Sequence, residues 1–117
     1  VLLAYDGSTK AQEGLYVAAY LAGQWSIPLV VITVIENESG QEHFSKAQEY
    51  LEAQGVTATL VSKQGPVAET IMTTANEHGC QLIILGGFGT GPVWDVVLGS
   101  VVDQVLCESK QPMLICR

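Results

Sequence analysis

A cluster of glycines follows an apolar run in the second half of the chain, in the segment LIILGGFGTGPVWDVVLGSVV. Gly86 and Gly89 come after the run, and Gly99-Ser100 precede a helical pattern. Glycine can adopt positive φ and lets backbone N–H groups point at an anion without interference from a Cβ atom. The free N–H groups at the start of a helix form a second anion site, to which the Ser100 hydroxyl adds a donor. This spacing indicates a phosphate site, although glycines are also ordinary loop residues.

The first apolar run, VLLAY, leads into Asp6, Gly7 and Ser8. The Asp6 carboxylate is an acceptor suited to the hydroxyl groups of a ribose. A carboxylate on one side and amide donors on the other would hold a nucleotide by its sugar and its phosphate. Simpler roles remain open, because Asp6 could hold the turn or cap the first helix and Ser100 could be only an N-cap. The convergence of these residues on strand ends favours the ligand.

Short apolar runs alternate with helical stretches along the whole chain. Strands are expected at residues 1–5, 29–35, 56–63, 82–85 and 113–116. Helices are expected from Ser8 or Thr9, from the capping box S-x-x-E at Ser39 to Gly55, from Gly65-Pro66 to Gly79, and from Ser100 to Pro112. This alternation predicts an α/β fold with a parallel sheet, helices on both faces, and the polar third strand at an edge. Ligands of such sheets bind beyond the carboxyl ends of the strands, where the strand order reverses.

The composition limits the classes of protein that the chain can represent. Its 117 residues fit one domain over 1–117, with 48% hydrophobic and 15% charged residues. A net charge of -7 argues against nucleic-acid binding by a basic face. No apolar run approaches the roughly 20 residues of a membrane span, and the start of the chain has no basic segment of a secretory signal. Because the chain lacks an initiator Met, we expect a trimmed domain or part of a longer or tandem protein.

Three cysteines and one tryptophan are predicted to be buried. Cys80, Cys107 and Cys116 lie among apolar residues without a C-x-x-C pair, which indicates free thiols rather than disulfides. Trp25 ends the first helix and is expected in the core. Free thiols are typical of a reducing compartment, so a cytoplasmic location is expected.

The sequence offers no recognisable catalytic set. It contains neither a Walker lysine motif nor a G-x-S-x-G elbow. His43 and His78 fall in the second and third helices and are expected at the surface, away from the strand ends. A general base would have to be Asp6 or Asp95, and neither is placed for in-line activation of water. Weak ATP hydrolysis is the most that we expect of an enzymatic activity.

The two motifs together resemble the universal stress protein family. The spacing Gly86-x2-Gly89-x9-Gly99-Ser100 is similar to the glycine signature of the ATP-binding members, and the turn at Asp6 and the order of elements match as well. The resemblance covers essentially the whole chain. It implies a Rossmann-like, adenine nucleotide alpha-hydrolase-like sheet of five parallel strands in the order 3-2-1-4-5. That order would place Asp6 and Gly86 on adjacent strands.

The resemblance also implies a set of ligand contacts. Asp6, after Ala4 and Tyr5, would bind the ribose of ATP or AMP, and Val34 would pack against the adenine. The sugar and the phosphates, with Mg where present, would lie against Gly86, Phe88, Gly89, Gly99, Ser100, Val101 and Val102. The family commonly forms homodimers through its last strand, which here contains Met113, Leu114, Ile115 and Cys116.

Three departures from the family pattern keep other functions open. Val102 stands where nucleotide-binding members often carry Ser or Thr, Phe88 where polar or basic residues are common, and Asp95 where a carboxylate would repel phosphates. No Lys or Arg occurs between Lys63 and Lys110, so a triphosphate would rely on backbone dipoles and a divalent ion. The preferred hypothesis is a dimeric nucleotide-binding module of the stress response. The alternatives are a dimerisation scaffold without a ligand and a slow ATPase.

Overall fold

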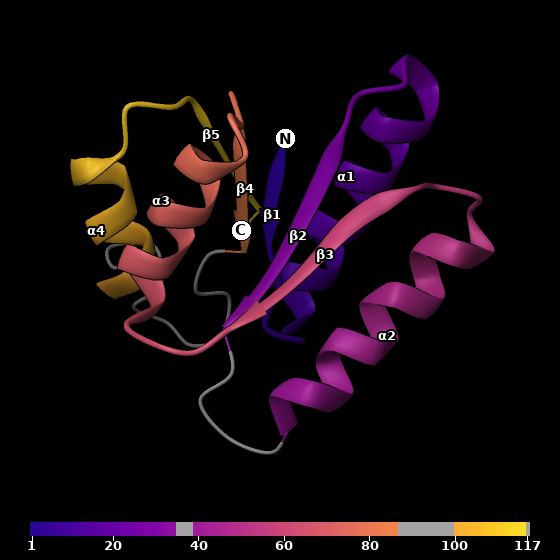
Figure 1. The fold of residues 1–117 in the computed structure, drawn as a ribbon, viewed down its shortest axis with the longest axis horizontal. Helices are drawn as coiled ribbons and strands as arrows, with labels where there is room; N and C mark the ends of the chain where they lie inside the picture. The colour runs from indigo at the N-terminus through magenta and orange to yellow at the C-terminus, as the bar shows by residue number, and fades with distance from the viewer. Residues whose placement is uncertain (35–38, 87–99, 117) are drawn as a thin grey trace.

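The computed structural model describes residues 1–34, 39–86 and 100–116, and in them strands and helices alternate as predicted (Figure 1). The strands are β1 (Leu2–Ala4), β2 (Leu29–Val34), β3 (Ala58–Lys63), β4 (Ile83–Gly86) and β5 (Met113–Cys116). The helices are α1 (Thr9–Trp25), α2 (Ser39–Ala53), α3 (Val67–Glu77) and α4 (Ser100–Glu108). The prediction differs only at element ends: β3 begins two residues later than expected, and α4 stops before Pro112.

The five strands form one parallel sheet in the order β3-β2-β1-β4-β5, which confirms the order expected from the family. β1 is central, and its Leu3 pairs with Val31 of β2 and with Ile84 of β4. The chain proceeds outward from β1 through β2 to β3, and then returns to β4 and β5 on the other side. The strand order therefore reverses between β1 and β4. The predicted edge strand, β3, does lie at an edge of the sheet.

Two helices cover each face of the sheet (Figure 1). Leu3 and Ile84 face α1 and α2, and are fully buried with the α1 residues Ala11, Leu15 and Ala18. The opposite face carries Leu2, Val30, Ile32, Ile83 and Leu85, which pack against α3 and α4. Strands buried on both faces explain the continuous apolar runs of the sequence. Each such side chain contributes about 1.5–3 kcal/mol relative to an exposed one.

Parallel strands require that the chain return along a helix after each strand. The helices therefore run antiparallel to the strands, so that each begins at the carboxyl end of the sheet and finishes at its amino end (Figure 1). None of the helices among the described residues is long and apolar enough to cross a membrane.

Two predictions of burial were wrong. Trp25 is 63% exposed, because it is the last residue of α1, where the helix extends past its buried stripe, and its ring contacts Tyr20 rather than the core. Cys107 is exposed near the end of α4, whereas Cys80 is buried and Cys116 is half-buried. All three cysteines are free, as predicted.

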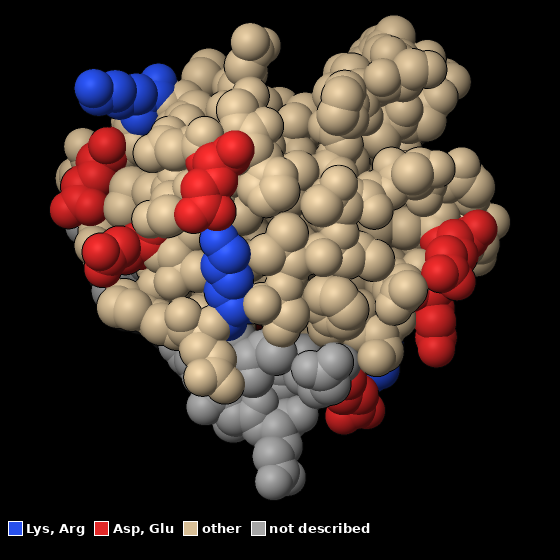
Figure 2. Space-filling view, in the orientation of Figure 1, with Lys and Arg blue, Asp and Glu red and all other residues tan. Residues whose placement is uncertain are grey.

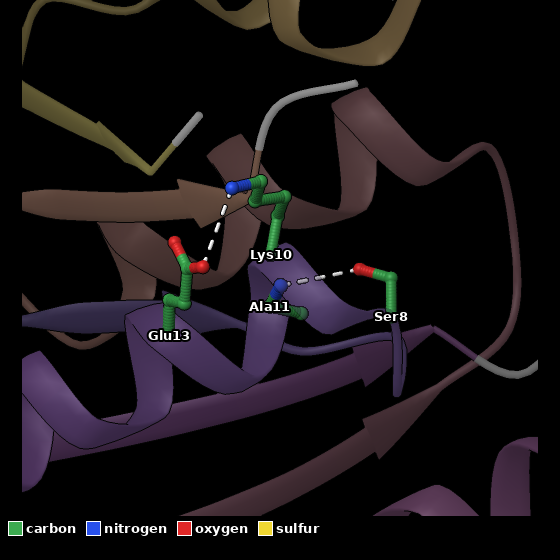
Figure 3. A network of polar contacts seen from close by, with 4 residues as sticks. All are labelled: Ser8, Lys10, Ala11 and Glu13. Atoms are coloured by element: carbon green, nitrogen blue, oxygen red, sulfur yellow. Dashed lines mark hydrogen bonds and ion pairs between the residues drawn. The ribbon is translucent and has the colours of Figure 1, made fainter. Parts of the chain in front are cut away.

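Ser8 is the N-cap of α1, as the sequence indicated. Its backbone is extended, and its hydroxyl accepts a hydrogen bond of 3.2 Å from the N–H of Ala11 (Figure 3). This bond satisfies one of the N–H groups that a helix start leaves without an intrahelical partner.

Replacing this cap should destabilise the domain by a measurable amount. We expect Ser8→Ala to lower the free energy of unfolding by about 1 kcal/mol, because the Ala11 N–H loses its acceptor. Ser8→Asp keeps an acceptor at the N-cap and should remain within about 0.5 kcal/mol of the parent protein. Urea denaturation of the three proteins measures both differences. Equal losses in the two variants would show that the cap is not what Ser8 contributes.

Candidate functional site

Two predicted site residues lie on neighbouring strands at the carboxyl end of the sheet. Asp6 follows β1, and Gly86 is the last residue of β4. These strands are paired, and the strand order reverses between them. The structure therefore brings the carboxylate and the start of the glycine segment to the position at which doubly wound sheets bind ligands.

The turn after β1 holds Asp6 in a defined position. One carboxylate oxygen of Asp6 accepts a hydrogen bond of 2.9 Å from the backbone N–H of Ser8. Gly7 between them has φ of +82°, a conformation that other residues adopt only with strain. Asp6 is exposed, and its second oxygen has no hydrogen bond to any residue of the described ranges. The simpler role predicted for Asp6, to hold the turn, is therefore real, and it leaves one oxygen available to a ligand.

His43 of α2 lies against this turn, which the sequence prediction did not anticipate. A Cβ atom placed on Gly7 would collide with the imidazole ring of His43. His43 is half-buried, so the prediction of a surface histidine remote from the strand ends was wrong. The sequence around His43 carries no signal for this position, because it results from the packing of α2 across the β1–α1 turn. His78, in contrast, is exposed as predicted.

Two buried side-chain polar atoms within the described ranges have no hydrogen-bond partner, His43 Nδ1 and Thr33 Oγ1. Thr33 is 1% exposed and is next to the last residue of β2, so it also lies near the carboxyl end of the sheet. Strand alternation directs it to the same face as Val31, which is the face covered by α1 and α2. Buried polar atoms are normally paired, so this part of the carboxyl end retains unused hydrogen-bonding capacity.

Lys10 supplies a positive charge at the same end of the sheet. It is in the first turn of α1, and its ammonium group is 3.3 Å from the carboxylate of Glu13 (Figure 3). Burial and the Glu13 carboxylate raise the pKa of the Cys116 thiol, and the Lys10 ammonium partly opposes them, so both charges are felt at the end of β5. Lys10 was not among the predicted site residues, although it follows Asp6 by only four residues and lies outside the stretch between Lys63 and Lys110 that lacks Lys and Arg.

The position of Lys10 in its helix is unusual on electrostatic grounds. The N-terminus of a helix carries partial positive charge and favours acidic side chains, yet α1 has no acidic residue in its first turn. A lysine there adds to the positive potential of the helix start, and the Glu13 carboxylate offsets only part of it. An anion bound at this end of the sheet would complement both charges.

Gly86 serves a packing role that the sequence did not reveal. A Cβ atom at this position would lie 2.6 Å from the backbone nitrogen of Ala11 and 2.8 Å from the carbonyl carbon of Lys10. Gly86 does not use the positive φ that glycine can adopt, since its φ is outside that range. The missing side chain lets the end of β4 approach the first turn of α1, and this requirement is independent of any ligand.

The other predicted contacts divide into four groups. Tyr5 is 3% exposed, and burial raises the pKa of its hydroxyl while a hydrogen bond with Gln12 partly opposes this, so the ring belongs to the core. Ala4 and Val34 are half-buried at the ends of β1 and β2. Ser100, Val101 and Val102 form the start of α4, and Phe88, Gly89, Gly99 and Asp95 lie outside the described residues.

These features define a doubly wound α/β domain with polar groups gathered at its switch point. Residues 37–117 match the Universal stress protein family, and the chain belongs to that family. A universal stress protein of Thermus aquaticus is 31% identical across the whole chain, which covers 97% of that relative. A universal stress protein of Synechocystis is 28% identical, and the chain spans 42% of its length.

Solved structures of the family share the fold. A universal stress protein from Archaeoglobus fulgidus is 26% identical and superposes with a TM-score of 0.84, over 99% of this chain and 42% of that one. A universal stress protein in complex with cAMP is 22% identical and superposes with a TM-score of 0.82, over 99% of this chain and 94% of that one. The universal stress protein from Archaeoglobus fulgidus in complex with dAMP is 19% identical and superposes with a TM-score of 0.76, over 99% of this chain and 95% of that one. At these last two identities the likeness supports the fold alone.

The contact between Gly7 and His43 can be tested through three substitutions. Gly7→Ala should destabilise the domain by about 1–2 kcal/mol through its positive φ and by a further amount through displacement of the His43 ring. Gly55→Ala is the matched control, since Gly55 has φ of +70° and open space around its Cβ position. In a His43→Ala background, the cost of Gly7→Ala should fall to that of Gly55→Ala.

Denaturation of the single and double variants measures this coupling. Additive effects of Gly7→Ala and His43→Ala would contradict the contact.

Proposed function

We propose that residues 1–117 form a regulatory domain that binds an adenine nucleotide at the carboxyl end of the sheet and signals its occupancy to a partner. The observation that carries this proposal is the position of Asp6 beside the end of β4, at the reversal of the strand order. Within the described ranges, one carboxylate oxygen of Asp6 has no partner and would be offered to the hydroxyls of a ribose. The domain would act in a reducing cytoplasm, in keeping with its three free cysteines.

The described residues supply distinct parts of such a site. Val34 at the end of β2 would contact the adenine, and Thr33 and His43 would offer the polar atoms that now lack partners. The phosphates would lie toward Lys10 and toward the N-terminus of α4, because the first N–H groups of a helix have no intrahelical partner and can bind an anion. The sequence motif adds Phe88, Gly89 and Gly99 to this end.

Two observations bear on the identity of the nucleotide. Solved relatives carry the adenine nucleotides cAMP and dAMP, which supports the class of ligand. The positive charge of Lys10 would offset the negative charge of more than one phosphate, so we include ATP as well as AMP in the proposal. Among the described residues, no group of three His, Cys, Asp or Glu side chains could hold a metal ion. Magnesium, where present, would arrive on the phosphates of ATP.

The first test is chemical identification of the ligand. Protein purified rapidly and then denatured should release an adenine nucleotide, detectable by mass spectrometry, and stripped protein should rebind ATP or AMP in calorimetric titration. Asp6→Asn keeps an oxygen for the Ser8 N–H but removes the charge that strengthens bonds to ribose hydroxyls. It should weaken binding about tenfold or more without a loss of stability.

Matched variants make this test specific. Glu108→Gln removes one negative charge at the far end of α4 and should leave the affinity unchanged. Lys10→Met should weaken ATP more than adenosine. Absence of any binding at millimolar nucleotide would favour the dimerisation scaffold, and turnover abolished by Asp6→Asn would favour the slow ATPase.

We also propose a homodimer formed through β5. This strand pairs with β4 on one side, and Leu114 remains 39% exposed on it. An apolar strand at the edge of a sheet is a natural template for pairing with a second copy.

The dimer can be tested with two exposed leucines. Leu114→Arg should convert the protein to a monomer, measured by light scattering during gel filtration, because it places a charge in the proposed interface. Leu106→Arg on α4 is the control, since Leu106 is 42% exposed and should tolerate the change without loss of the dimer. A parent protein that is itself monomeric, or an unchanged mass for Leu114→Arg, would reject the proposal.

A further inference from the structure

An open groove lies between α1 and α2 at the amino end of the sheet, opposite the proposed nucleotide site. Its volume is about 480 Å³, which is within the range of small-molecule sites. It is lined by Tyr16, Ala19, Tyr20, Gly23, Gln24, Tyr50, Gln54 and Val56. Figure 1 shows that α1 and α2 both finish on this side of the molecule. The lining contains three tyrosines and two amides, and among the described residues it contains no charged side chain.

The aromatic side chains of this groove are unusually exposed for a small domain. Tyr16 is 51% exposed and Tyr20 is 60% exposed, although tyrosine rings are more often partly covered. Tyr16 contacts Tyr50 with ring centroids 5.0 Å apart, and Tyr20 meets the edge of Trp25 at 6.3 Å. The first pair joins α1 to α2, and the second extends the aromatic surface to the end of α1. Tyr50 also packs against the core, whereas neither the core nor the nucleotide site explains the exposed rings of Tyr16 and Tyr20.

The electrostatic surroundings of the groove favour a positive ligand. The C-terminal end of a helix carries partial negative charge, which lysine or arginine in the last turn usually balances. Neither α1 nor α2 has a basic residue in its last turn, and Gln24 and Gln54 of the groove lie at these two helix ends. The net charge of the protein is -7. In Figure 2, the surface over the end of α1 shows no Lys or Arg.

We propose that this groove binds a small organic cation with a methylated ammonium head group. Faces of tyrosine rings attract such cations, and the attraction increases when the cation leaves water. The ammonium group would lie against the rings of Tyr20 and Tyr50, near the two helix ends. The side-chain amides of Gln24 and Gln54 would bind a hydroxyl or carbonyl group on the same ligand. The site is separate from the nucleotide site and does not depend on it.

The same observations disfavour other occupants. An anion would meet two helix C-termini without a basic side chain beside them. A purely apolar ligand would make no use of the amides of Gln24 and Gln54, which are exposed and would stay bonded to water. A cation with a polar tail satisfies both the rings and the amides.

The test compares choline with its uncharged isostere 3,3-dimethylbutan-1-ol. The two compounds have the same shape, so a difference in binding reports the effect of the charge. Each would be titrated into isotopically labelled protein and followed by correlated ¹H–¹⁵N NMR, with sodium chloride as the control for ionic strength. We expect choline to shift the amide signals of Gly23, Gln24, Gln54 and Val56 in a saturable manner at millimolar concentration. The isostere should produce smaller shifts that do not saturate over the same range.

Two substitutions of one exposed residue then identify the aromatic face as the cause. Tyr20→Leu should weaken choline binding by between about twofold and thirtyfold, whereas Tyr20→Phe retains the ring and should stay close to the parent protein. Because Tyr20 is 60% exposed, neither change should prevent folding, and the NMR spectra report this directly.

Three results would overturn the proposal. Equal binding of choline and its isostere would define an apolar site without preference for charge. Absence of saturable shifts with choline would show that the groove does not bind such cations. A trimethyllysine peptide that binds much more tightly than choline would define a protein-docking surface instead of a small-molecule site.

Discussion

The close approach of β4 to the first turn of α1 is the contact on which the arrangement of the carboxyl end depends. Gly86 makes it possible, since any Cβ atom there would meet backbone atoms of Lys10 and Ala11. The approach fixes the start of α1 beside the end of β4, and thereby fixes the turn that carries Asp6. The ring of His43 packs against the same turn at Gly7. The position of the carboxylate thus results from backbone packing at Gly86 and from an imidazole ring at Gly7.

The fold could be predicted from the sequence because its elements give consistent local signals. The apolar runs are long enough for strands buried on both faces, and Ser8, Gly55 and Gly79 mark the helix ends at which they were expected. Errors arose where a residue's surroundings depend on how far an element extends. Trp25 follows the apolar periodicity of α1, but it is the last residue of the helix, beyond the region where the sheet covers it. Cys107 comes two positions after the buried Val105, and this spacing directs it to the exposed face of α4.

The candidate site could be predicted only in part, for a related reason. Asp6 and Gly86 follow strands, and the order of a parallel sheet is enough to bring strand ends together. Lys10 and His43 lie at the same end of the sheet, but they belong to helices. Helical periodicity predicts which face of a helix is buried, but not which loop that face covers. Gly86 shows a further limit. Its residue type signalled a close approach correctly, but the approaching atoms are those of α1, which no spacing within the glycine motif could have indicated.

The common direction of the helices has a consequence for the molecule as a whole. Because every helix runs opposite to the parallel strands, the individual peptide dipoles add instead of cancelling. The helices therefore contribute an electric dipole aligned with the strands, superimposed on a net charge of -7. In a solution of mixed ions, such a body turns as a charged molecule approaches, and presents its carboxyl end to anions and its amino end to cations. The direction of the helices alone thus favours an anionic ligand at the carboxyl end of the sheet and a cationic ligand at the amino end.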